Sequence, residues 1–245
     1  MPFRILTVCT GNICRSPQAE QLLRAGFTAA HGTDATWPLP EVSSAGVYAL
    51  VDEPMPEQAA ALSREFGGDP DVHVARQLTK EMVEQSDLII ALAREHRAAI
   101  AKLSPRASRY TFTLRELARV LGPASESPLP LVEEPASAVP LPLVEEPASA
   151  VPLPVVEEPA SAVPLPLVEE PASEASRRLE TTTPAPGDFP GWLAYAAQHR
   201  GYHPGTLDED DVIDPYRRSD ETYRRSAEQI VPAVSAIVTR ITSTL

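Results

Sequence analysis

The stretch that decides the fold is "FRILTVCTGNICRSPQAEQLLRAGF", residues 3–27. Its first seven residues form an apolar run that ends at turn-forming residues, a pattern typical of a buried β-strand. Helical spacing follows from residue 16 to residue 32, with Pro17 in the first turn, where proline is favoured. The two cysteines of the chain, Cys9 and Cys14, lie where the strand gives way to the helix, so this junction is the first place to look for chemistry.

Outward from this stretch, strands and helices alternate. Short apolar runs predict strands at residues 41–46, 86–93 and 108–114, and helical spacing predicts helices at residues 55–67, 94–103, 115–121, 189–201 and about 220–242. Strands joined through helices form right-handed crossovers and a parallel sheet that is covered on both faces. The prediction is an α/β fold, a three-layer sandwich around a central parallel sheet of four strands.

The junction after the first strand has the features of an oxyanion site. Open α/β sheets bind ligands beyond the carboxyl ends of their strands, where a helix N-terminus also directs its backbone N–H groups and positive dipole end. Gly11 permits a tight turn, Asn12 tolerates positive φ, and Ser16 can cap the helix. Residues 10–15 are therefore predicted to form a phosphate-binding loop.

Cys9 opens this loop and Arg15 closes it six positions later. The positive surroundings that bind phosphate also favour the thiolate form of a cysteine, and a guanidinium can hold two phosphate oxygens at once. This C-x5-R spacing, between a strand and a helix and followed by a serine, is the signature of cysteine-dependent phosphatases. The alternative interpretation is an inert buried Cys9 and an ordinary surface Arg15.

Three segments carry a resemblance to a known family: "VCTGNICRSP" (8–17), "HVARQLTKE" (73–81) and "DVIDPYRRSDETY" (211–223). Over residues 3–122 and 205–245 the chain resembles the low-molecular-weight protein tyrosine phosphatases. The resemblance implies hydrolysis of phosphotyrosine through a cysteinyl-phosphate intermediate, with neither metal nor cofactor.

The resemblance also implies the catalytic roles. Cys9 attacks phosphorus, Arg15 and the loop amides hold the phosphoryl oxygens, and Asp214 acts first as general acid and then as general base. The alternative for Asp214 is a helix N-cap, because Asp210 and Asp211 offer rival carboxylates nearby.

Supporting roles follow from the same resemblance. Ser16 corresponds to a hydroxyl that bonds the thiolate, Asn12 to an asparagine that rigidifies the loop, and Ser44 and His73 to its partners. Cys14 corresponds to a cysteine that forms a reversible disulfide with the nucleophile. Ser44 and His73 could instead be ordinary polar groups, and Cys14 a packing residue. The predicted phosphate-binding positions are Thr10, Gly11, Asn12, Ile13, Cys14 and Ser16.

Aromatic walls are expected around a phosphotyrosine pocket, since they suit a flat side chain. Tyr216 follows the Asp-Pro pair, and Tyr48 is the candidate for the opposite wall. Both tyrosines could instead be packing residues. Many relatives have a second aromatic residue where this chain has Arg217, which could attract acidic flanks of a substrate.

Two other functions are open to this sequence. An arsenate reductase uses the same fold and loop, but the thioredoxin-coupled form needs further cysteines, and none follows Cys14, so only a reductase using a low-molecular-weight thiol fits. The other is an inactive phosphoprotein-binding module. The expected partner is a phosphotyrosine protein, with a bacterial tyrosine kinase as candidate, and not a nucleic acid.

Residues 128–175 consist of a twelve-residue repeat that begins "PLPLVEEPASAV". The repeats hold nine glutamates and no basic residue, which leaves −4 of the formal net charge of −13 for the rest of the chain. Three prolines per copy disfavour helix, so we expect an extended linker, or else a docking site for a partner. The predicted organisation is a phosphatase domain of residues 1–122 and 190–245, interrupted by an insertion of residues 123–189.

Localisation is expected to be cytoplasmic, without membrane insertion. No apolar run approaches the ~20 residues that cross a bilayer, and the first residues lack the features of a signal peptide. Two closely spaced cysteines also do not resemble the disulfide framework of a small secreted domain.

Overall fold

The computed structural model describes residues 2–32, 35–122, 183–202 and 205–243, all of which belong to one compact unit. The repeats of residues 128–175, and with them the expected extended linker or docking site, lie outside the described residues. Residues 183–189, which the sequence analysis assigned to the insertion, lie with the compact unit.

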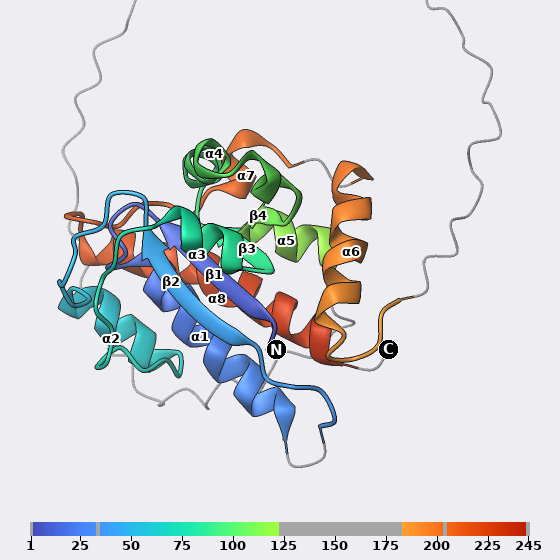
Figure 1. Cartoon of the computed structure of the whole chain (residues 1–245). Coiled ribbons are helices and arrows are strands. Elements are labelled where there is room, and N and C mark those ends of the chain that lie inside the picture. Colours follow the sequence, from blue (N-terminus) through green and yellow to red (C-terminus); the bar gives the residue numbers. More distant parts are fainter. Residues whose placement is uncertain (1, 33–34, 123–182, 203–204, 244–245) are drawn as a thin grey trace, which may run out of the picture. The chain divides into compact units, whose positions relative to one another are not determined.

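The centre of the unit is a parallel sheet in the order β2-β1-β3-β4, which confirms the predicted fold class (Figure 1). The strands are β1 (Arg4–Cys9), β2 (Glu41–Gly46), β3 (Leu88–Ala91) and β4 (Thr111–Thr113). Strand β1 is paired on both sides, and its last residue, Cys9, is in register with Gly46 at the end of β2. The candidate nucleophile thus stands at the carboxyl edge of the sheet.

Helices cover both faces of the sheet. They are α1 (Arg15–His31), α2 (Glu57–Glu65), α3 (Lys80–Gln85), α4 (Arg94–Leu103), α5 (Leu114–Leu121), α6 (Phe189–His199), α7 (Leu207–Asp210) and α8 (Asp220–Thr242), with 3-10 turns at Pro105–Arg109 and Arg200–Tyr202. Sequence periodicity did not predict α3 and α7, because runs of six and four residues are too short to show a helical period.

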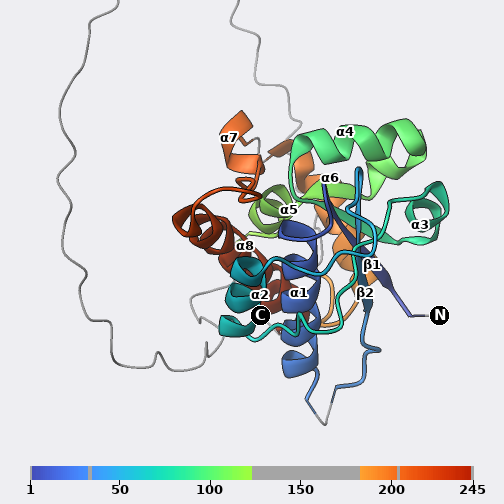
Figure 2. The same cartoon turned by 90° about the vertical axis from the view of Figure 1, so that its left-hand side faces the viewer.

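Alternation along the strands builds one core on each face of the sheet. Ile5 and Cys9 of β1 face a core with helices α1, α5, α6 and α8, whereas Leu6 and Val8 face a second core with α3 and α4. Figure 2 shows α1 and α8 on one side of the sheet and α3 and α4 on the other. These are the three layers that the sequence predicted.

Helix α8 brings the end of the chain to the first loop. Ser219 caps it by accepting a hydrogen bond from the Thr222 backbone N–H, and its buried face, including Ile230 and Val238, packs in the same core as α1. Gly26 of α1 permits this approach, since a Cβ there would lie 3.0 Å from Val238 Cγ2. The segment before α8, which holds Asp214, therefore lies beside the loop of residues 10–15.

Helix α6 is anchored to this unit by aromatic and charged contacts. Phe189 is 3 % exposed and stacks on Phe3 with ring centroids 5.2 Å apart. At the end of the helix, Arg200 donates to both carboxylate oxygens of the buried Glu116 of α5 and to the Thr111 backbone oxygen. The chain thus rejoins the core firmly where α6 begins and ends.

Candidate active site

The loop after β1 is held from outside through its carbonyl groups. The carbonyls of Cys9, Thr10 and Gly11 accept hydrogen bonds from the backbone N–H groups of Val47, Tyr48 and Leu50, at 2.9, 2.9 and 3.0 Å. In a trans peptide the N–H points opposite to the C=O, so the N–H groups of residues 10–12 are directed to the inner side of the loop. An anion there would meet a ring of donors.

Two backbone positions make this loop possible. Asn12 has φ 57°, the left-handed region that asparagine tolerates better than most residues. Gly46 lies so close to the loop that a Cβ would stand 2.5 Å from the Thr10 carbonyl oxygen. The sequence predicted the first of these requirements but not the second.

The Asn12 side chain is buried and fully bonded. Its Nδ2 donates to Ser16 Oγ at 3.0 Å and Ser44 Oγ at 2.8 Å, and its Oδ1 accepts from the Arg76 backbone N–H at 2.9 Å. His73 Nε2 lies 2.7 Å from the Asn12 carbonyl oxygen. Ser44 and His73 thus both contact Asn12.

The nucleophile position is next to a hydroxyl. Cys9 is 2 % exposed, and its Sγ lies 3.0 Å from Ser16 Oγ. Ser16 Oγ accepts from Asn12, so its own proton is free to point to the sulfur at 3.0 Å or to the Ala45 carbonyl oxygen at 3.5 Å. A hydrogen bond of this kind stabilises a thiolate both as nucleophile and as leaving group.

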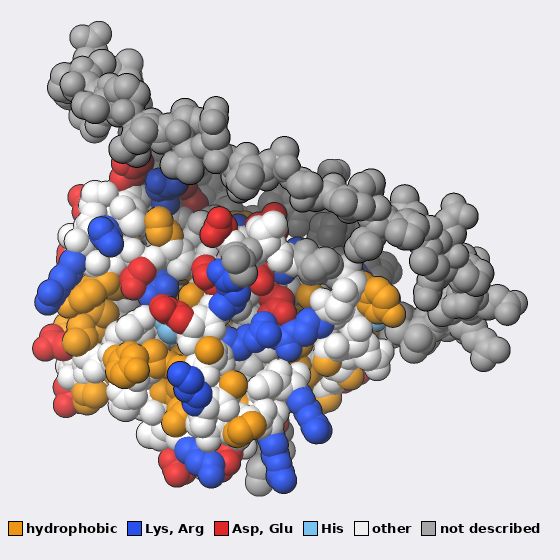
Figure 3. Space-filling view, turned by 90° about the horizontal axis from the view of Figure 1, so that it is seen from above, with side chains coloured by type: hydrophobic (Ala, Val, Ile, Leu, Met, Phe, Trp, Pro, Cys, Tyr) orange, Lys and Arg blue, Asp and Glu red, His pale blue; other side chains and the backbone are white. Residues whose placement is uncertain are grey.

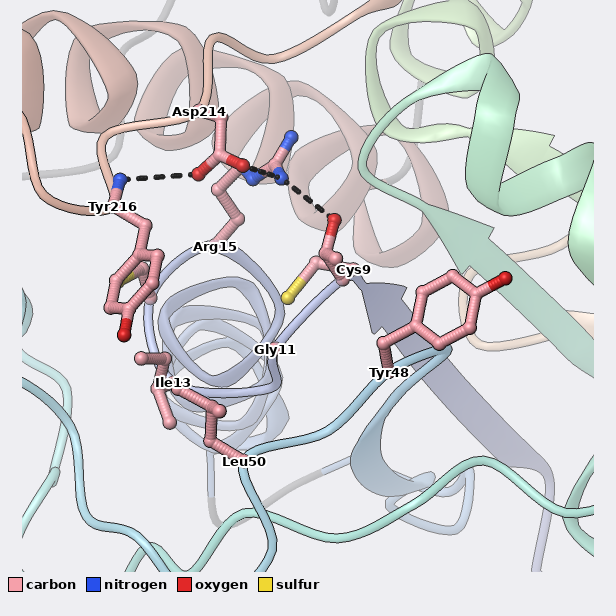
Figure 4. A pocket seen from close by; sticks show the side chains of 10 residues that line it. Cys9, Gly11, Ile13, Arg15, Tyr48, Leu50, Asp214 and Tyr216 are labelled. Carbon is pink, nitrogen blue, oxygen red and sulfur yellow. Dashed lines mark hydrogen bonds and ion pairs between the residues drawn. The ribbon is translucent and has the colours of Figure 1, made fainter.

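Arg15 lies at the centre of a second set of contacts. Its Nη1 donates to the Val212 carbonyl oxygen at 3.1 Å, and its Nη2 lies 3.3 Å from Thr10 Oγ1 and 2.7 Å from Asp214 Oδ2. The guanidinium is 4 % exposed, whereas the Asp214 side chain is 51 % exposed. In Figure 4 the Asp214 carboxylate joins Arg15 on one side and the Tyr216 backbone N–H on the other.

The rival carboxylates are engaged elsewhere. Asp211 accepts three hydrogen bonds from Arg94, one from its backbone and two from its guanidinium, and Asp210 pairs with Arg119 at 2.6 Å. Seen from above the sheet edge, basic and acidic side chains are interspersed rather than gathered by sign (Figure 3). Among Asp210, Asp211 and Asp214, only Asp214 lines the pocket.

The pocket is a cavity of about 120 Å³ at the mouth of the loop. Tyr48 and Tyr216 lie on its opposite sides, with Ile13 and Leu50 along one edge (Figure 4). Tyr48 is 79 % exposed, which excludes a packing role for it in this structure. The lining residues are Cys9, Thr10, Gly11, Ile13, Cys14, Arg15, Tyr48, Leu50, Asp214 and Tyr216.

Cys14 lines the same pocket but differs from Cys9 in its surroundings. It is 5 % exposed, and its Sγ lies 4.0 Å from the Tyr223 hydroxyl oxygen. Burial, with a smaller contribution from the neighbouring Cys9, raises the pKa of the Cys14 thiol to about 12. Cys14 is therefore a neutral thiol at physiological pH.

Three residues of the site were not predicted from the sequence. Leu50 lines the pocket, Arg76 bonds Asn12, and the buried His96 of α4 lies with Nε2 2.9 Å from Thr10 Oγ1. All three come from segments far from the loop in the sequence, and although Arg76 lies in the segment of residues 73–81 that resembles the family, nothing in the sequence identified its contact with Asn12.

Within the described ranges, no group of three or more His, Cys, Asp or Glu side chains is arranged to hold a metal ion. Nor does any helix of those ranges combine the length and apolar character needed to span a membrane.

Comparisons with known proteins agree with this geometry. The family described as low molecular weight phosphotyrosine protein phosphatase matches residues 4–125. The chain is 42 % identical over 101 residues to the low molecular weight protein-tyrosine-phosphatase Etp of Escherichia coli, a match that covers 41 % of this chain and 62 % of Etp. It is 34 % identical over 115 residues to Ptp of Acinetobacter johnsonii, named likewise, covering 46 % of this chain and 74 % of Ptp.

A relative with another specificity is the protein-arginine-phosphatase of Geobacillus stearothermophilus, 36 % identical over 116 residues, covering 47 % of this chain and 72 % of that protein. With Etp, by comparison, the match spans only about three fifths of that relative's length.

Solved structures show the same fold. The tyrosine phosphatase AmsI of Erwinia amylovora has a TM-score of 0.54 at 19 % identity, with 98 % of this chain and 93 % of AmsI covered. The tyrosine phosphatase Wzb of Escherichia coli in complex with sulphate has a TM-score of 0.53 at 19 % identity, with 98 % and 99 % covered.

Proposed function

Because the chain belongs to the low molecular weight protein tyrosine phosphatase family, we propose that it hydrolyses phosphotyrosine in proteins through a cysteinyl-phosphate intermediate. The observation that carries the proposal is the convergence of three groups on one pocket: the Cys9 sulfur, the Arg15 guanidinium and the Asp214 carboxylate.

In the first step the Cys9 thiolate attacks phosphorus opposite the phenolic oxygen. An S–P bond forms as the P–O bond to the phenol breaks, and Asp214 gives its proton to the departing oxygen. The N–H groups of residues 10–12 and Arg15 hold the remaining phosphoryl oxygens, where charge is redistributed in the transition state. Arg15 is already oriented by Val212 and Thr10.

In the second step the Asp214 carboxylate takes a proton from water, and the water oxygen attacks phosphorus. The S–P bond breaks, inorganic phosphate leaves, and the thiolate is regenerated. The Ser16 hydroxyl, 3.0 Å from the sulfur, stabilises the thiolate as it leaves. The negative sulfur is a stronger and nearer acceptor for the Ser16 proton than the Ala45 carbonyl oxygen, which lies 3.5 Å from Ser16 Oγ.

The shape of the pocket supports a phenyl ester as substrate. Tyr48 and Tyr216 flank its mouth, and Ile13 and Leu50 give it an apolar edge, which suits a flat ring more than a charged side chain. Arg217 lies over the Tyr216 ring at 5.0 Å from the ring centroid and adds positive charge beside the mouth. A tyrosine-phosphorylated protein, with a bacterial tyrosine kinase as the first candidate, is thus the proposed partner.

The test is a parallel assay of four substrates: p-nitrophenyl phosphate, a phosphotyrosyl peptide, a phosphoarginyl peptide, and arsenate with a low-molecular-weight thiol. We expect phosphate release from the first two, and none from the same substrates with Cys9→Ser, because a serine hydroxyl is not ionised here. Preferred turnover of the phosphoarginyl peptide or of arsenate would replace the proposed substrate. Absence of turnover of all four, with binding of phosphotyrosyl peptide retained, would indicate a binding module.

A further inference from the structure

His96 is a buried group that the proposed mechanism does not use. It lies on α4, its side chain is 0 % exposed, and its Nε2 is 2.9 Å from Thr10 Oγ1. Its other ring nitrogen, Nδ1, has no hydrogen-bond partner among the described residues. A histidine enclosed in this way and joined to the phosphate-binding loop needs a physical explanation.

The charge state of His96 follows from its surroundings. Burial, together with the nearby positive charge of Arg15, lowers its pKa to about 3, and the opposing effect of Asp211 is smaller. The ring is therefore neutral at physiological pH and carries a single N–H.

The unpartnered nitrogen identifies where that proton is. A proton on Nδ1 would leave a buried N–H without an acceptor, which proteins avoid more strictly than an unused acceptor. The proton is therefore on Nε2, and Nε2–H donates to Thr10 Oγ1 at 2.9 Å, which is nearer than the exposed Glu95 carboxylate oxygen at 3.4 Å.

This tautomer determines the direction of the Thr10 hydroxyl. Thr10 Oγ1 already accepts from His96 and from Arg15 Nη2, at 2.9 and 3.3 Å, so both of its acceptor positions are used. Its own O–H remains as a donor. Thr10 lines the pocket with Cys9 and Asp214, so an oxygen of a phosphoryl group that binds there can accept this hydrogen bond.

We propose that the Thr10 hydroxyl donates a hydrogen bond to the phosphoryl group in the pocket, and that His96 is the positioning residue that keeps this hydroxyl in its donating orientation. Arg15 cannot do this alone, because its Nη2 is shared with Asp214 and must turn to phosphate oxygens when substrate binds. His96 is held in the fold by α4, whose first backbone N–H is bonded to Asp211. The inference rests on the proposed function, whose phosphate site it completes.

The experiment measures binding of inorganic phosphate by calorimetry, together with kcat and KM for p-nitrophenyl phosphate. Thr10→Val removes the hydroxyl at nearly equal shape, and we expect it to weaken phosphate binding about tenfold, the effect of one hydrogen bond to a charged group. Thr10→Ser keeps the hydroxyl and should bind as the wild type does. His96→Leu should match Thr10→Val, while His96→Gln, which retains an N–H donor, should recover much of the loss.

A double variant separates positioning from a general structural effect. His96→Leu combined with Thr10→Val should bind phosphate no more weakly than either single variant, because both remove the same hydrogen bond. Ile100→Ala is the matched control, since Ile100 is another fully buried residue of α4 without a link to Thr10; it should lower Tm and leave phosphate affinity unchanged. Additive losses in the double variant would overturn the proposal.

Two results keep the proposal testable if His96→Leu does not fold. Nitrogen-15 NMR of the wild-type protein should show the His96 proton on Nε2, and a proton on Nδ1 would overturn the assignment. The proposal would also be overturned if Thr10→Val bound inorganic phosphate with the same affinity as the wild type. Phosphate binding that depends on Thr10, without hydrolysis of any phosphate ester by the wild type, would instead refute the proposed function and leave this inference standing.

Discussion

Arg15 Nη2 and Asp214 Oδ2 lie 2.7 Å apart, so the candidate general acid forms an ion pair with the cation that is the candidate to bind phosphate. A phosphoryl group that enters the pocket needs the same guanidinium in bidentate contact. Binding of phosphate must therefore displace the carboxylate from Arg15. A protonated Asp214 has no charge to hold it there, and it is this form that donates to a leaving group. The ion pair thus links substrate binding to release of the acid.

We predict that Asp214→Ala lowers kcat about 10²- to 10⁴-fold for phenyl phosphate and much less for p-nitrophenyl phosphate, whose leaving group needs no proton. The same variant should bind inorganic phosphate more tightly, because the competing carboxylate is gone. Steady-state kinetics over a series of leaving groups, with calorimetry for phosphate, checks both parts. Asp208→Ala, an exposed carboxylate of α7, is the control and should change neither. Equal losses across all leaving groups would assign the acid to another residue.

A second prediction concerns Glu116, which joins α5 to α6. Burial alone would raise its pKa above the ordinary value of 4.5, but hydrogen bonds from Arg200 and from the Thr113 backbone N–H, with the charges of Arg200 and Arg97, lower it. A carboxyl with a lowered folded-state pKa stabilises the fold above its unfolded-state pKa, and this contribution is lost as the pH falls through the folded-state value.

Glu116→Gln should therefore lower the free energy of unfolding at pH 7 by about 2 kcal/mol and flatten its dependence on pH below the ordinary carboxyl value. Urea unfolding at a series of pH values measures this. Glu65→Gln removes an exposed partner of Arg224 and serves as control, with little change expected at any pH. An unchanged pH slope in Glu116→Gln would show that this carboxyl does not govern acid stability.

Local patterns predicted much of the fold and of the loop. Strand β1, Asn12 with its positive φ, and α1 follow from neighbouring residues, and α8 begins and ends where periodicity placed it. The contacts around Arg15 could not be obtained in this way. Thr10 and His96 are 86 residues apart in the sequence. Asp210 and Asp211 could be told from Asp214 as candidates for the general acid only by their ion pairs with Arg119 and Arg94. Spacing in the sequence carries no information about such pairs.

A third prediction concerns the repeats. The described residues supply the catalytic groups of the pocket and the two cores of the sheet, so we expect catalysis not to require residues 128–175. Replacing them by a short Gly/Ser bridge should leave kcat and KM for p-nitrophenyl phosphate within about twofold of wild type, because loop length has little effect on stability. Loss confined to a phosphoprotein substrate would indicate docking by the repeats. A general loss of activity would contradict the prediction.

The last prediction distinguishes the two cysteines of the pocket. Cys9 lies at the start of the phosphate-binding loop, with the Ser16 hydroxyl 3.0 Å from its sulfur, whereas burial raises the pKa of the Cys14 thiol to about 12. Peroxide should therefore oxidise Cys9 first, giving a sulfenic acid and water. The Cys14 thiol, in the same pocket, can attack this sulfenic acid to form a disulfide and a second water.

We expect the wild type to lose activity in peroxide and to recover most of it with dithiothreitol, which reduces the disulfide. Cys14→Ser should lose activity at a similar rate but recover far less, because its sulfenic acid proceeds to the irreversible acids. Tyr223→Phe, which keeps Cys14 and removes only the neighbouring hydroxyl, is the matched control and should recover as the wild type does. Mass spectrometry of the peptide that contains both cysteines identifies each oxidised form. Inorganic phosphate in the pocket should slow the inactivation of all three proteins, because it covers Cys9. If the wild type and Cys14→Ser recovered equally, Cys14 would be a packing residue without a protective role.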